Sequence, residues 1–162
     1  MSVVMPQELY SPEQLGLVTI ELRQHLEKLQ DRDVRRKVAK TSGETLPPLS
    51  ILANKVLEAN NLTPAAAQGI STLVDEFEAL RPKAPIARLI LAELPDEDMR
   101  NQLTEWFRTK IHPLSLLTFT ARTDIGGGFK LQAGSKQYDF SFKTQLLNNK
   151  MHLAEIFSGG RK

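Results

Sequence analysis

The sequence predicts an α+β protein, with an N-terminal amphipathic helical domain followed by a small β-α-β-β-β-α domain. Apolar residues recur at three- and four-residue steps in the first half of the chain and alternate with polar residues in the second half. Pro82 and Pro85 separate the two patterns. We therefore expect a helical domain over residues 1–81, a linker over 82–85 and an α+β domain over 86–162.

The composition narrows the classes of function. The chain has 162 residues, of which 41% are hydrophobic and 25% charged, as in ordinary soluble proteins. A formal net charge of +2 is too small to indicate a nucleic-acid partner. The absence of cysteine excludes disulfides, zinc thiolates and thiol catalysis. No apolar run approaches the roughly 20 residues that span a bilayer, and no secretory signal is visible, so we expect membrane contact only through partner subunits.

The first helix has a clear predicted start. Ser11 is the expected N-cap, Pro12 the first helical residue and Gln14 the partner that closes a capping box. Downstream, leucine and valine form an apolar stripe that must pack against something. A packed helical domain is one interpretation, and a helix of another protein is the other. The candidate partner-helix surface consists of Leu15, Val18, Leu22, Leu26 and Leu29.

Two further helices are predicted before the linker. Residues 48–59 carry apolar positions at helical spacing and end at an asparagine pair. Thr63 and Pro64 repeat the pattern of a cap followed by proline, which predicts a third helix ending near Arg81.

The second half opens with a predicted strand over residues 86–92 and a helix over residues 95–110. Asp96, Glu97 and Asp98 lie at the start of this helix and basic residues at its end, matching the helix dipole at both ends. We interpret the three acids as helix-start residues rather than as a metal site. Trp106 is expected to be the main anchor of this helix in the core.

Three strands and a helix are predicted to complete the chain. Alternation over residues 116–122, 129–133 and 138–142 is typical of half-buried strands, which we expect to form a meander. The terminal helix is expected to run from Phe142 to Phe157, with more apolar surface than one small sheet needs.

The glycines between these strands are interpreted as structural. A P-loop requires lysine and a hydroxyl residue directly after its last glycine, and a dinucleotide-binding loop requires a further glycine at a position that holds Leu131. We therefore predict positive φ angles or a bulge, and no cofactor. Neither the histidines nor any serine has catalytic or metal-ligand spacing, so a binding or structural role is favoured over an enzyme. The predicted turn residues are Gly126, Gly127, Gly128 and Gly134.

The same region resembles a known family. The residues that carry the resemblance are Gly127-Gly128-Phe129, Gly134, Asp139-Phe140-Ser141 and a following helix with Leu146. With these residues, and over residues 86–157, the chain is similar to the delta subunit of F-type ATP synthases, whose mitochondrial counterpart is the oligomycin-sensitivity-conferring protein. The chain departs from the family in having Ile125 and Gly126 after Asp124, where two more residues are usual, and in a shorter N-terminal half.

The resemblance implies a non-catalytic peripheral-stalk (stator) subunit of an F-type proton-translocating ATP synthase, which links the catalytic head to subunit b. In this family the N-terminal domain binds an alpha subunit and the C-terminal domain binds subunit b. The protein would then be a monomer within a hetero-oligomeric complex, peripheral at the cytoplasmic face of the cell inner membrane.

Two alternatives remain. One is an E-like peripheral-stalk subunit of a V-type or archaeal-type ATPase, which should have a long N-terminal helix paired with another chain. The other is an unrelated nucleotide- or small-molecule-binding protein that uses the loop over Gly126–Gly128.

Overall fold

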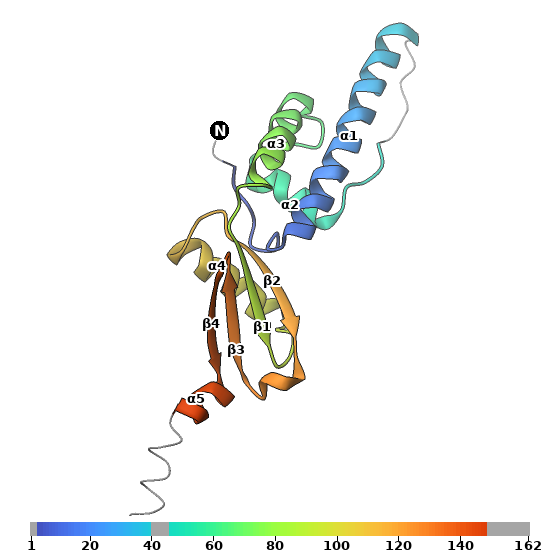
Figure 1. The fold of residues 1–162 in the computed structure, drawn as a ribbon. Helices are drawn as coiled ribbons and strands as arrows, with labels where there is room; N and C mark the ends of the chain where they lie inside the picture. The colour runs from blue at the N-terminus through green and yellow to red at the C-terminus, as the bar shows by residue number, and fades with distance from the viewer. Residues whose placement is uncertain (1–2, 40–45, 149–162) are drawn as a thin grey trace, which may run out of the picture.

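The computed structural model, which describes residues 3–39 and 46–148, confirms the α+β fold. Figure 1 shows helices at one end of the molecule and the sheet, with further helices, at the other. The elements in order are α1 (Pro12–Ala39), α2 (Ile51–Ala59), α3 (Ala67–Leu80), β1 (Ile86–Leu91), α4 (Glu97–Lys110), β2 (Leu116–Ala121), the 3-10 turn η1 (Thr123–Ile125), β3 (Gly128–Ala133), β4 (Lys136–Ser141) and α5 (Phe142–Asn148).

The predicted capping box starts α1. The Gln14 amide donates to the Ser11 hydroxyl, and the Gln14 side-chain oxygen accepts from the Ser11 amide, both at 3.1 Å. From this start α1 lies against α2 and α3, and the three helices share one hydrophobic core around the fully buried Phe77. The apolar faces of these three helices are therefore buried against one another rather than against a partner protein.

The other two helix starts differ from the sequence prediction. Helix α2 begins at Ile51 because Ser50 is its N-cap and accepts from the Ala53 amide at 3.1 Å. The predicted cap of α3 at Thr63 is wrong, since α3 begins at Ala67 without a side-chain cap. The Thr63 carbonyl instead accepts from the Ala66 amide at 3.0 Å, closing a turn before the helix.

The sheet has the strand order β2-β1-β3-β4. Strands β1 and β2 are parallel, whereas β3 is antiparallel to both β1 and β4. The predicted meander is wrong, because β1 lies between β2 and β3. The crossover through α4 places β2 beside β1, and the largely apolar β1 takes a central position, where both of its edges are paired.

Helix α4 covers one face of the sheet and is anchored by Phe107 rather than by Trp106. The Phe107 side chain is 6% exposed and packs with Leu89 and Leu117 in a second core cluster. The prediction for Trp106 is wrong, since this residue is 52% exposed. The apolar stripe of α4 is rotated by one position relative to the expected one, which leaves an aromatic side chain on the surface.

The N-terminal segment, residues 3–11, contacts both ends of the molecule. The Val4 amide donates to the Asn60 side chain at the end of α2, and the Tyr10 carbonyl accepts from the Leu117 amide in β2. The division into two domains stays a prediction, because this segment bridges the two parts.

Candidate functional site

An apolar groove of about 760 Å³ lies between α4 and the β3–β4 half of the sheet. Its α4 wall presents Met99, Leu103 and Trp106, which are spaced four and three residues apart and so follow one side of the helix. The sheet wall presents Phe129 and Phe140. A surface recess of this size and apolar character is typical of a binding site.

The groove exists because α4 covers only part of the sheet. Residues of β1 and β2 under α4 are buried, whereas Phe129, Tyr138 and Phe140 of β3 and β4 are 37%, 46% and 44% exposed. Phe140 is paired with Phe129, and Tyr138 with Leu131, so these side chains share one face. A second helix beside α4 would complete the layer over this face.

The aromatic rings on this face of β3 and β4 pack against one another. The Phe129 and Phe140 ring centroids are 5.0 Å apart, and those of Tyr138 and Phe140 are 6.4 Å apart and nearly parallel. Such pairs form a rigid apolar wall. Glu93 and Asp96 also line the groove and give it an acidic rim, which favours a partner with a basic group beside its apolar face.

The four predicted turn glycines all have positive φ, from +59° at Gly134 to +127° at Gly127. At Gly128 a Cβ atom would lie 2.4 Å from the Phe140 carbonyl oxygen and 2.9 Å from the Ser141 Cα atom. Glycine is therefore required where β3 begins against the end of β4.

Gly127 fixes the start of α5 by a different contact. Its carbonyl accepts from the Phe142 amide at 3.1 Å, and a Cβ atom at Gly127 would lie 2.6 Å from the Phe142 ring. The glycine loop thus packs against β4 and α5. Within the proposed loop over Gly126–Gly128, this packing argues against a bound phosphate at Gly127 and Gly128, whereas Gly126 has open space around it.

Asp139 and Ser141 complete the same junction. The Ser141 hydroxyl and amide donate to one Asp139 oxygen at 2.6 and 2.9 Å, and Lys130 lies 3.0 Å from the other oxygen. The hydrogen bonds from Ser141, followed by that from Lys130, hold the pKa of Asp139 well below its ordinary value. The residues that carry the family resemblance therefore act together to join β3, β4 and α5.

The predicted partner-helix stripe does not form a surface. Four of its residues are at most 2% exposed, and Leu26 is partly buried against the same cluster. They pack against α2 and α3, which is the packed-domain interpretation. A partner helix cannot reach this stripe in the folded chain. The four residues are Leu15, Val18, Leu22 and Leu29.

The predicted helix-start acids have a local role. Asp96 is the N-cap of α4 and accepts from the Met99 amide at 2.8 Å. Within residues 3–39 and 46–148, no group of three or more histidines or acids is close enough to hold a metal ion. In the same residues no helix is both long and apolar enough to cross a membrane.

Sequence reasoning missed the groove, although its residues were visible. The alternation at Phe129, Tyr138 and Phe140 predicts an apolar sheet face but not whether that face is covered. The sequence did hold one signal. It predicts a single crossover helix, and one short helix is too narrow to cover a whole face of a four-stranded sheet. The rest of the predicted terminal helix, residues 149–157, lies outside the described residues.

Comparisons with known proteins give a weak structural likeness and no match in sequence. No protein-family model matches the sequence, and no curated protein matches it. Among solved structures, the chain is similar to a chain of the Toxoplasma gondii mitochondrial ATP synthase hexamer, with 15% sequence identity and a TM-score of 0.37. The match covers 82% of this chain and 83% of the other. A likeness this weak leaves the functional argument to the residues of the chain itself.

Proposed function

We propose that this protein is a non-catalytic stator subunit of an F-type proton-translocating ATP synthase, in which its α+β part binds a helix of subunit b. The observation that carries the proposal is the apolar groove between α4 and the β3–β4 face. It provides space and apolar contacts for one more helix, about 10 Å across, beside α4. An amphipathic helix laid into such a groove is a recurring mode of recognition.

The junction of β3, β4 and α5 at the glycine loop supports the same assignment. The signature shared with the delta-subunit family includes Gly128, Asp139 and Ser141, and here these residues contact one another. Their contacts are structural, as expected for a subunit that transmits force and catalyses nothing. A link of this kind needs a broad interface that dissociates slowly.

The remaining parts of the proposal follow from the resemblance. The helical part would contact an alpha subunit, and the protein would be a monomer in the complex, held at the cytoplasmic face of the cell inner membrane by its partners. An E-like stalk subunit is less well supported. The apolar stripe of α1 is buried against α2 and α3, which leaves it unavailable for pairing with another chain.

The test is purification of the tagged chain from its own cells. We expect subunit b and an alpha subunit to be recovered with it, and Phe129→Asp to abolish recovery of subunit b. Leu17→Asp is the matched control, because Leu17 is 68% exposed on α1 and lies outside the groove. Recovery of no ATP synthase subunit by the unmodified chain would contradict the proposal.

A further inference from the structure

Strand β2 forms an edge of the sheet, and its outer backbone groups can be assigned from three hydrogen bonds. The Leu116 amide donates to Pro85 and the Arg122 amide to Leu91, so the even-numbered residues face β1. The Leu117 amide points the other way and donates to the Tyr10 carbonyl at 2.7 Å. Backbone groups alternate along a strand, so those of Phe119 and Ala121 also face outward.

Among the described residues, the outer edge of β2 makes one backbone hydrogen bond to another segment. Tyr10 supplies the bond to Leu117, and the chain then turns into α1 at Ser11. In the described residues, the amides of Phe119 and Ala121 have no hydrogen-bond partner. An edge with unpaired amides can accept a strand from another polypeptide.

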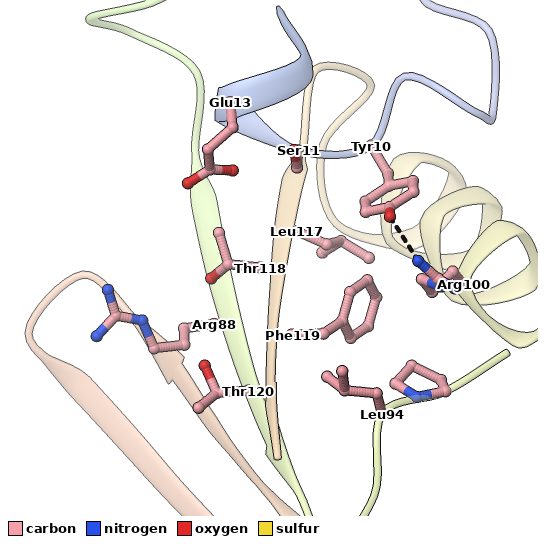
Figure 2. Close-up of a pocket in the computed structure, with 11 residues that line it drawn as sticks. Tyr10, Ser11, Glu13, Arg88, Leu94, Arg100, Leu117, Thr118, Phe119 and Thr120 are labelled. Atoms are coloured by element: carbon pink, nitrogen blue, oxygen red, sulfur yellow. Dashed lines mark hydrogen bonds between the residues drawn. The ribbon is translucent and has the colours of Figure 1, made fainter. Parts of the chain in front are cut away.

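A recess of about 440 Å³ runs along this edge (Figure 2). On one side of β2, Figure 2 shows Leu117 and Phe119 pointing toward Tyr10, Leu94 and the start of α4. The Tyr10 and Phe119 ring centroids are 5.7 Å apart in an edge-to-face arrangement. This side of the recess suits apolar side chains.

The other side of the recess is polar and carries a free cation. Figure 2 shows Thr118, Thr120 and Arg88 pointing away from the apolar side. Arg88 is exposed and has no ion pair among the described residues. The Thr118 hydroxyl oxygen is buried and has no hydrogen-bond partner there either. Both groups are suited to an anionic side chain.

The charges around the recess leave a net positive balance. Arg100 donates to the Tyr10 hydroxyl at 2.8 Å and brings a second cation to the apolar side. Glu13 is the acidic residue that lines the recess, and Figure 2 shows it on the same side of β2 as Thr118 and Arg88. Two cations against one acid favour an acidic ligand over a basic one.

We propose that the edge of β2 binds an extended segment of a partner protein in which apolar and acidic residues alternate. Backbone carbonyl groups of the segment would accept hydrogen bonds from the amides of Phe119 and Ala121. These bonds would extend the ladder along β2 beyond the one that the Tyr10 carbonyl makes. Its apolar side chains would contact Phe119 and Leu94, and its acidic side chains would meet Arg88 and Thr118. This surface shares only Leu94 and Pro95 with the apolar groove, and it does not depend on the stator assignment.

The test uses a capped Val-Glu-Val-Glu-Val peptide and amide NMR of the whole chain at low salt. We expect saturable shifts at Phe119 and Ala121 and slower exchange of both amides with solvent. The control peptide Val-Lys-Val-Lys-Val should bind about tenfold more weakly. Arg88→Glu should reverse this preference, which a nonspecific apolar interaction would not do.

A second variant tests the backbone contacts. Ala121→Pro removes one outward amide, and proline is tolerated at this position of an edge strand because the bonds to β1 are unaffected. We expect severalfold weaker binding by a folded variant. The proposal is overturned if no shift occurs at about 1 mM peptide, if both peptides bind equally, or if the shifts centre on Trp106.

Discussion

The Arg108 guanidinium on α4 donates a hydrogen bond of 2.6 Å to the backbone carbonyl of Leu9. It also donates to the carbonyls of Met5 and Pro6 at 2.9 and 2.8 Å. One side chain therefore fixes the N-terminal segment against the α+β part. Burial lowers the pKa of Arg108 to about 10, so the group stays charged at neutral pH.

Arg108→Ala should lower the free energy of unfolding by about 2–4 kcal/mol, because several partly buried carbonyls lose a charged donor. Arg108→Lys should lower it less, since an ammonium group can replace some but not all bonds of the planar guanidinium. Urea unfolding measures both changes. Arg122→Ala is the control, as Arg122 is exposed and pairs with Asp124. Equal losses for Arg108→Ala and Arg122→Ala would contradict this role.

Gly128→Ala should destabilise the chain by about 2 kcal/mol or more, because the added methyl group meets the backbone of β4 at a positive φ. Gly134→Ala should cost only about 1 kcal/mol, since Gly134 also has a positive φ but has open space around it. Thermal unfolding of the two variants separates the steric effect from the conformational one. Equal melting temperatures would show that the contact at Gly128 is unimportant.

Asp139→Asn should lose more stability at neutral pH than at low pH. The folded-state pKa lies below the ordinary value of 3.8, so the ionised carboxylate stabilises the fold above about pH 4. This stabilisation is lost as the pH falls toward the folded-state pKa. Melting temperatures from about pH 7 to about pH 3 should therefore converge for the two proteins. Ser141→Ala should show part of the same pH dependence. A difference in melting temperature between Asp139→Asn and the unmodified protein that stays constant with pH would refute this role of Asp139.

Phe107→Ala and Trp106→Ala should have opposite consequences. The first should cost about 3–5 kcal/mol of stability, because Phe107 is the buried anchor of α4. The second should cost little stability but weaken partner binding, because Trp106 is half exposed in the groove. Chemical denaturation and a binding assay on each variant check the pair. A large loss of stability from Trp106→Ala would contradict the observed orientation of α4.

The helix starts at Ser11 and Asp96 could be predicted from the sequence because capping is local. Hydrogen bonds between residues three positions apart depend on little else, and Ser11 and Asp96 both accept them. The predicted start at Pro95 was two residues early, since α4 begins at Glu97. Thr63 failed as a cap although its sequence context was similar. The chain makes an extra turn there before α3, and a cap motif does not reveal such a turn.

The strand order and the groove could not be predicted in this way. Alternation assigns Phe129 and Leu131 to one face of a strand, but it does not say which strand lies beside them. Whether Phe140 is buried depends on how far α4 reaches across the sheet, which is set by packing between distant residues. The edge of β2 was missed for the same reason, since the rung from Tyr10 joins residues far apart in the sequence.

The fluorescence of Trp106 tests the central claim most directly. Trp106 is the only tryptophan of the chain and lines the apolar groove. Titration with the soluble part of subunit b, made without tryptophan, should shift its emission to shorter wavelength in a saturable way as the ring leaves water. Phe129→Asp should weaken this binding at least about tenfold, and Leu17→Asp should not. An unchanged spectrum at saturating subunit b would contradict the stator assignment of the groove.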